Sequence, residues 1–126
     1  EKPNAVFQNV RPRITLFKTV SIAEARAIHK RQSFDKTDGP FGKGVYLFYT
    51  LTDAINNNKN GVTYLACDAK VSNPYHLRPN ETLKTNRSHH NACKLYIGNY
   101  HNCPYYIFTD NKLISGIHYC GGKNWD

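Results

Sequence analysis

Apolar and polar residues alternate in patterns that predict most of the elements of this chain. Residues 14–17 alternate and consist of strand formers, so they predict a first strand. Apolar residues then recur at helical spacing, and Ser21 with Glu24 forms a capping box, in which each residue bonds the other's backbone amide. A helix is therefore predicted from the residue after Ser21 to about Lys30.

Five further strands and a second, short helix follow the first helix. Residues 62–71 carry apolar side chains on both faces, which is typical of a central strand. The turn Asp110-Asn111-Lys112 separates two strand-like runs, which predicts a terminal hairpin. The other strands are expected at 45–49, 94–97, 105–109 and 113–120, and the short helix begins at Thr52 and ends in an asparagine-rich run. This order predicts a single α+β domain over residues 1–126 with a mainly antiparallel sheet.

The charge balance is strongly basic. Lys and Arg total 17 against nine acidic residues, a formal charge of +8, which favours phosphates, nucleic acid or anionic surfaces as partners. The basic residues are scattered, however, and Arg26 and Lys30 share the predicted helix's polar face, as on any solvated surface. No apolar run approaches the roughly 18 residues of a membrane helix, so no membrane span is expected.

Cysteines and glycosylation sequons together favour an oxidising compartment. The four cysteines contain no CxxC pair, and an even count suits two disulfides. Of the three possible pairings, the strands expected to flank a terminal hairpin favour Cys103 with Cys120, leaving Cys67 with Cys93.

Two sequons, at Asn80 and Asn86, lie in one polar stretch where an exposed loop is expected. The chain opens at Glu1 without Met or an apolar signal. We therefore expect a mature, secreted, extracellular glycoprotein.

Metal and nuclease chemistry find little support in the residue spacing. The histidines match no ligand pattern, and adjacent His89 and His90 would point to opposite faces of an extended segment, so no metal site is predicted.

A secreted ribonuclease-like or ribotoxin-like protein is a further alternative, with His118 near the last strand. Such an enzyme needs a carboxylate beside the histidine and an arginine for the phosphate. The only glutamate after Glu24 is Glu81, which lies inside a sequon, and no arginine follows Arg87.

The run from Phe41 to Phe48, FGKGVYLF, resembles the glycine-rich turn and strand of the ADP-ribosyltransferase fold, in the branch of the poly(ADP-ribose) polymerases. Residues 64–75 are similar to that family's next strand and its exit, and residues 105–113 to its final strand and turn. The resemblance covers about residues 14 to 119 and implies an ADP-ribosyltransferase-like fold.

The resemblance also implies a nucleotide site. Gly42 and Gly44 would let the backbone approach a ligand, and Tyr46 would offer its ring to the nicotinamide of NAD. Lys18 and Thr19 stand where the family has histidine and glycine on its first strand. Pro104, followed by Tyr105, stands where many members carry a catalytic glutamate.

These substitutions remove the groups that stabilise the positive sugar of the transition state. We therefore expect a catalytically degenerate, monomeric effector or toxin-like protein with no cofactor, acting on a protein or glycan target. The alternative is a divergent mono-ADP-ribosyltransferase that uses NAD through Lys18, Thr19, Tyr46 and Tyr105. A cleft filled by Phe41, Phe48 or Tyr105 would argue against that alternative.

Overall fold

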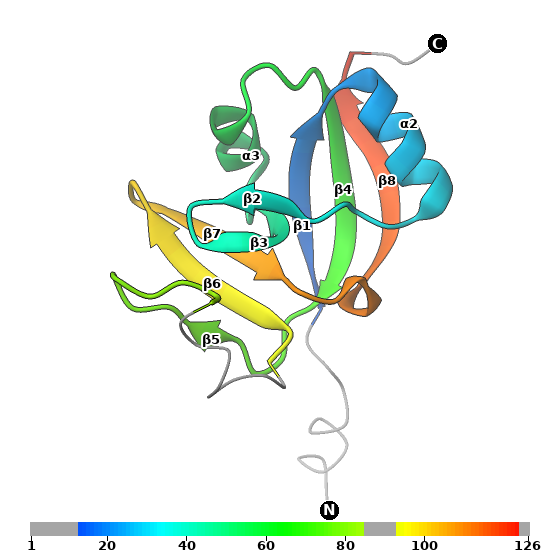
Figure 1. The fold of residues 1–126 in the computed structure, drawn as a ribbon. Helices are drawn as coiled ribbons and strands as arrows, with labels where there is room; N and C mark the ends of the chain where they lie inside the picture. Colours follow the sequence, from blue (N-terminus) through cyan, green and yellow to red (C-terminus); the bar gives the residue numbers. More distant parts are fainter. Residues whose placement is uncertain (1–12, 85–92, 124–126) are drawn as a thin grey trace, which may run out of the picture.

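The fold is built on two β-sheets (Figure 1). The computed structural model describes residues 13–84 and 93–123. The first sheet has three antiparallel strands in the order β1-β4-β8. These strands are β1 (Arg13–Val20), β4 (Thr63–Lys70) and β8 (Ile114–Gly122).

The second sheet has five strands in the order β2-β3-β7-β6-β5. All its pairs are antiparallel except β5 with β6. A bridge between Phe17 and Phe48 joins it to the first sheet. Its strands are β2 (Thr37–Gly39), β3 (Gly42–Leu47), β5 (Tyr75–His76), β6 (Leu95–Tyr100) and β7 (Cys103–Phe108).

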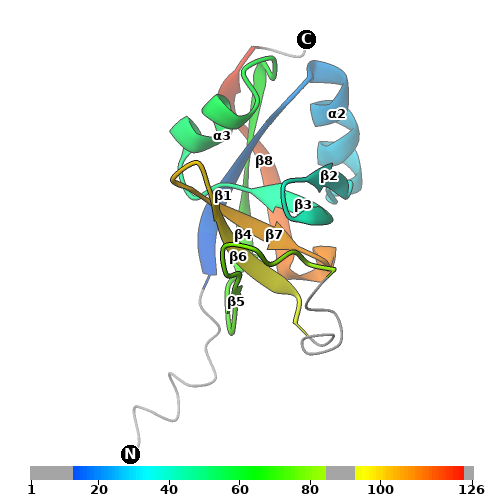
Figure 2. The ribbon, with the colours of Figure 1, turned by 60° about the vertical axis from the view of Figure 1, so that its left-hand side comes forward.

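Two α-helices lie on opposite sides of the first sheet, as Figure 2 shows. Helix α2 (Ile22–Arg31) packs against β4 and β8, and α3 (Leu51–Asn57) packs against β1. The predicted capping box is present: Ser21 Oγ accepts from Glu24 N and the Glu24 carboxylate accepts from Ser21 N, both at 3.2 Å. A short 3-10 helix, η1 (Asn111–Leu113), precedes β8.

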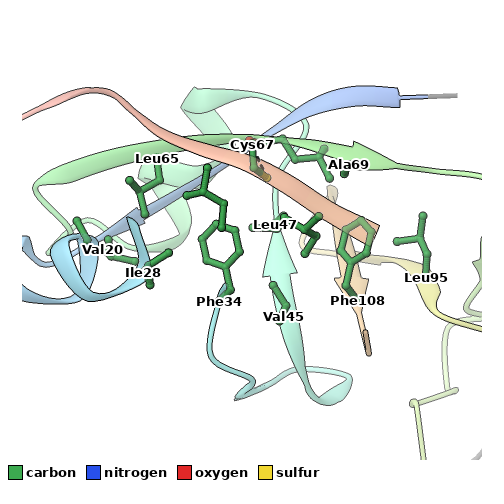
Figure 3. Packing of buried hydrophobic residues seen from close by; sticks show 14 residues of the cluster. Val20, Ile28, Phe34, Val45, Leu47, Leu65, Cys67, Ala69, Leu95 and Phe108 are labelled. Atoms are coloured by element: carbon green, nitrogen blue, oxygen red, sulfur yellow. Dashed lines mark hydrogen bonds between the residues drawn. The ribbon is translucent and has the colours of Figure 1, made fainter. Parts of the chain in front are cut away.

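An aliphatic cluster fills the space between the two sheets (Figure 3). Alternate residues of β1 and β3 enter it, such as Leu16 from the first sheet and Leu47 from the second, both fully buried. The aliphatic cluster consists of Leu16, Val20, Ala25, Ile28, Phe34, Val45, Leu47, Leu65, Cys67, Ala69, Leu95, Phe108, Ile114 and Ile117.

An aromatic cluster covers the opposite face of the second sheet. The residues between those of the aliphatic cluster on β3 and β7 enter it, so each of these strands separates the two clusters. Leu77 and Leu83, from the chain after β4, and Ala54 of α3 pack over it. The aromatic cluster consists of Phe41, Tyr46, Phe48, Ala54, Tyr96, Tyr105 and Ile107.

Most predicted elements are confirmed. The domain is α+β, its sheets are mainly antiparallel, an N-terminal helix and one short helix are present, and β4 is the central strand of its sheet. The predicted terminal hairpin is wrong, because β8 pairs with β4 in the first sheet. Both edges of β7 are already occupied, by β3 and β6, so η1 carries the chain across to the other sheet. Strand β5 lies in what was expected to be loop.

No helix in the described part of the chain is long and apolar enough to cross a membrane, in agreement with the expectation from sequence.

Candidate functional site

Tyr46, the residue expected to face a nucleotide, is folded back onto its own hairpin. Its hydroxyl donates to Gly42 O at 2.6 Å and accepts from Phe41 N at 3.0 Å, and its side chain is only 4% exposed. Burial raises the pKa of the Tyr46 hydroxyl, although its bond from the Phe41 backbone opposes this. The hydroxyl therefore closes the β2–β3 turn, since it bonds both a donor and an acceptor of that turn.

The glycines of this turn are explained by contacts within the protein. Gly42 has a φ of +115°, a backbone conformation that favours glycine, and Leu83 N donates to the neighbouring Phe41 O at 2.9 Å. A Cβ on Gly44 would lie 2.7 Å from Ile107 Cγ2 and 3.6 Å from a methyl group of Leu83. Leu83 therefore covers the glycine turn. The positive φ accounts for Gly42 and close packing accounts for Gly44, both without a ligand.

Tyr105 lies at the centre of the aromatic cluster. Its ring centroid is 4.9 Å from that of Phe48, 5.8 Å from that of Tyr46 and 6.2 Å from that of Phe41, all in edge-on arrangements. Its hydroxyl accepts from Asn57 Nδ2 at 2.8 Å. Phe41, Phe48 and Tyr105 are 6%, 1% and 7% exposed and pack in one cluster with Tyr46. A cleft filled by these residues was expected to argue against an enzyme that uses NAD, and they do fill it.

Lys18 extends from β1 toward the backbone of β3. Its Nζ donates to Tyr46 O at 3.0 Å. Burial lowers the pKa of Lys18 from 10.5 to about 8, and the charge of Glu24 opposes part of that effect. A fraction of Lys18 is therefore neutral near physiological pH, in contrast with an ordinary surface lysine.

Thr19 forms hydrogen bonds with α3 and with the residue after it. Its hydroxyl lies 3.1 Å from both Ala54 O and Asn58 O, and its backbone carbonyl accepts from Asn58 Nδ2 at 2.9 Å. The side chain is 2% exposed. Thr19 therefore anchors the helix to the first sheet, and its carbonyl already has a partner.

A cavity of about 270 Å³ opens beside Lys18. Neither Tyr46 nor Tyr105 lines it, so the residues predicted to form one nucleotide site are divided between this Lys18 cavity and the aromatic cluster. The asparagines of the cavity were missed, because an asparagine-rich run indicates only a loop in sequence. The cavity is lined by Lys18, Thr19, Val20, Glu24, Thr37, Phe48, Ala54, Asn57 and Asn58.

Pro104 pairs with Asn99 in the β6–β7 ladder and offers no group that could replace a glutamate. Asp110, the nearest carboxylate after it in sequence, accepts from Lys112 N at 2.9 Å and lies 3.8 Å from Lys94 Nζ. Asp110 therefore serves the turn before β8, as its position in the sequence suggested.

All four cysteines are free thiols, so neither expected bridge is present. Cys103 lies in β7 and Cys120 in β8, and these strands belong to different sheets rather than to one hairpin. Cys67 is fully buried in the aliphatic cluster, whereas Cys93 packs against the aromatic cluster on the other side of the second sheet. Burial raises the pKa of the Cys67 thiol to about 12, which makes it inert.

The residues of the ribonuclease alternative are not brought together. His118 is exposed on β8 of the first sheet. Glu81 follows β5 of the second sheet, and both its carboxylate oxygens accept from Tyr75 OH at 2.9 Å. Arg87 lies outside the described residues, as do Asn86, His89 and His90. Of the Asn80 sequon, Asn80 itself is exposed, whereas Glu81 and Thr82 are half-buried.

Within residues 13–84 and 93–123 there is no group of three or more His, Cys, Asp or Glu side chains that could hold a metal ion. Comparison of this chain with protein-family models, with curated proteins and with solved structures gave no match.

Proposed function

We propose that this chain is a secreted, non-catalytic protein of the ADP-ribosyltransferase-like fold that acts by binding another molecule. The family resemblance of the glycine turn supports the fold, as do the α+β architecture and the position of Tyr46 on the strand after that turn. The sequons and basic charge are compatible with a glycan or protein target outside the cell.

The filled aromatic cluster is the observation that carries this proposal. A nicotinamide ring stacked on Tyr46 needs space beside its ring, and Tyr105, itself packed against Phe48, occupies that space. Opening that space would expose several buried rings, each of which contributes about 1.5–3 kcal/mol by burial. In addition, none of Lys18, Thr19 and Pro104 can stabilise a developing positive charge on a sugar. An ammonium cation, a hydroxyl already bonded to backbone carbonyls and a pyrrolidine ring supply no negative partner.

Calorimetric titration of the purified protein with NAD, followed by a transfer assay with labelled NAD, tests this proposal. We expect neither transfer nor any binding that depends on Lys18. Tyr46→Ala is unsuitable as a probe because it would empty a buried site, so Lys18→Gln is the better variant. Lys59→Gln, an exposed lysine after α3, is the matched control.

A divergent mono-ADP-ribosyltransferase is the second candidate, and the Lys18 cavity favours it. The cavity joins a lysine that is partly neutral near pH 8 to the carboxylate of Glu24 and the amides of Asn57 and Asn58. NAD binding that Lys18→Gln abolishes and Lys59→Gln preserves, together with label transferred to protein, would establish this enzyme and overturn the binding-only function.

A further inference from the structure

A second and larger cavity, of about 580 Å³, lies away from the Lys18 cavity and shares no lining residue with it. It lies against the glycine turn, at the side covered by Leu83. Its volume is in the range of small-molecule sites. Its described lining residues are Lys36, Gly42, Lys43, Leu83, Lys84, Cys93, Tyr96 and Thr109.

Three lysines from three separate segments meet at this cavity. Lys36 precedes β2, Lys43 lies in β3 and Lys84 follows β5 in the chain. No described residue forms an ion pair with any of them, and no acidic residue is among the described lining residues. Asp38 lies opposite Lys43 in the β2–β3 ladder without pairing with it. The described lining therefore concentrates positive charge that no ion pair among the described residues compensates.

The rest of the lining is mainly apolar. Leu83 packs against the aromatic cluster, Tyr96 belongs to it and is 4% exposed, and the backbone of Gly42 adds no side chain. Thr109 also lines the cavity, but its hydroxyl lies 3.5 Å from both Cys93 O and Lys94 O and so already has partners within the protein. A ligand that fits this lining has an anionic group for the lysines and a flat or apolar body for Leu83 and Tyr96.

We propose that this cavity binds a small phosphate monoester with an aromatic or apolar body. A phosphate monoester carries about −1.5 to −2 charges at pH 7 and presents three acceptor oxygens, one for each lysine. Ammonium groups donate charge-assisted hydrogen bonds to such oxygens, and these are the strong ones. This proposal does not rest on the function proposed above, because it concerns other residues.

Titration with phenyl phosphate, followed by calorimetry and by backbone amide NMR shifts, tests the assignment. We expect saturable binding, with the largest shifts at Gly42, Leu83 and Thr109 and little change at Asn57. Inorganic phosphate, which lacks the ring, should bind about tenfold more weakly, and phenol, which lacks the charge, should not bind measurably. Equal affinity for phenyl phosphate and inorganic phosphate would overturn the apolar part of the site, and with it the proposal.

Lysine variants provide the second arm of the test. Lys43→Gln and Lys84→Gln should each lower the affinity for phenyl phosphate about tenfold. Lys59→Gln, with the same loss of charge, should leave this affinity within about twofold of wild type. An equal loss in Lys59→Gln would mean attraction by net charge alone and would overturn the site, as would the absence of saturable binding at millimolar ligand. NAD also carries phosphates, so an NAD signal lost in Lys43→Gln but kept in Lys18→Gln would belong to this cavity.

Discussion

The aliphatic and aromatic clusters lie on the two faces of one sheet and are built in different ways. The aliphatic cluster contains a single side chain with a heteroatom, Cys67, whose thiol donates to Leu16 O, and is otherwise held by shape and burial. The aromatic cluster contains three tyrosines, and hydroxyls such as that of Tyr46 bond backbone or asparagine groups. Adjacent residues of β3 divide between them, Leu47 on one face and Tyr46 on the other. Strand β3 therefore separates the aliphatic cluster, which depends mainly on apolar packing, from the aromatic cluster, which also depends on specific hydrogen bonds.

The aliphatic face should be the more costly to damage. Leu47→Ala removes a fully buried side chain and leaves a cavity between the two sheets, so we expect the free energy of unfolding to fall by about 2–5 kcal/mol. Urea unfolding measures this. Leu113→Ala, at a partly buried position beside the same cluster, is the control and should lose clearly less. Equal losses at the two positions would contradict the view that the sheets are held together by this cluster.

On the aromatic face, adding atoms should lower the free energy of unfolding, as removing them does. A Cβ on Gly39 would lie 2.6 Å from Tyr46 Cε1 and 2.7 Å from its hydroxyl oxygen, so Gly39→Ala must displace the tyrosine ring. We expect a loss of about 1–3 kcal/mol in urea unfolding. In a Tyr46→Ala background the same substitution meets no ring, and its cost should largely disappear. A cost that persists there would place the strain in the backbone of β2 rather than against Tyr46.

The aliphatic cluster was largely predictable from the sequence, because alternation decides which residues of a strand face inward. The pattern over residues 62–71 identified β4 as central for this reason. The partner of a strand is not contained in that pattern. Sequence proximity favoured a hairpin of β7 with β8, and only the occupied edges of β7 exclude it.

The candidate site was predictable only in part. The glycine turn and Tyr46 were found, but the turn is covered by Leu83, which lies about 40 residues further along the chain and has no sequence signal for this contact. Asn57 and Asn58 belong to a run that indicates a loop, and only the fold brings them to Lys18. Long-range contacts of single side chains therefore decided between packing and ligand binding.

The Tyr46 hydroxyl offers a milder test of the same face. Tyr46→Phe keeps the ring but leaves Phe41 N and Gly42 O without their side-chain partner, so we expect a loss of about 1–2 kcal/mol. Tyr49→Phe, at a position that is 55% exposed, should change the free energy of unfolding very little. Equal small effects in the two variants would mean that water replaces the hydroxyl in the turn, and that the aromatic cluster is held by shape as the aliphatic cluster is.

The smallest expected effect concerns Lys18 of β1, whose Nζ donates to Tyr46 O on β3. Because burial lowers its pKa from 10.5 to about 8, the folded protein loses this proton at a lower pH than the unfolded chain does. Between these two values the unfolded state binds more protons, so the contribution of Lys18 to stability rises with pH. From pH 7 to pH 9 the gain should be about 1 kcal/mol.

Other groups also titrate in this range, and burial raises the pKa of Tyr46 and Tyr105, which lowers stability at still higher pH. The informative quantity is therefore the difference between wild type and Lys18→Met, measured by urea unfolding from pH 7 to pH 9. As the pH rises, we expect the free energy of unfolding of wild type to gain about 1 kcal/mol relative to that of Lys18→Met. The free energy of unfolding of Lys59→Met should instead run parallel to that of wild type. Parallel profiles for Lys18→Met would mean that the ammonium group reaches water, and the Lys18 cavity would then be open enough for a ligand to enter.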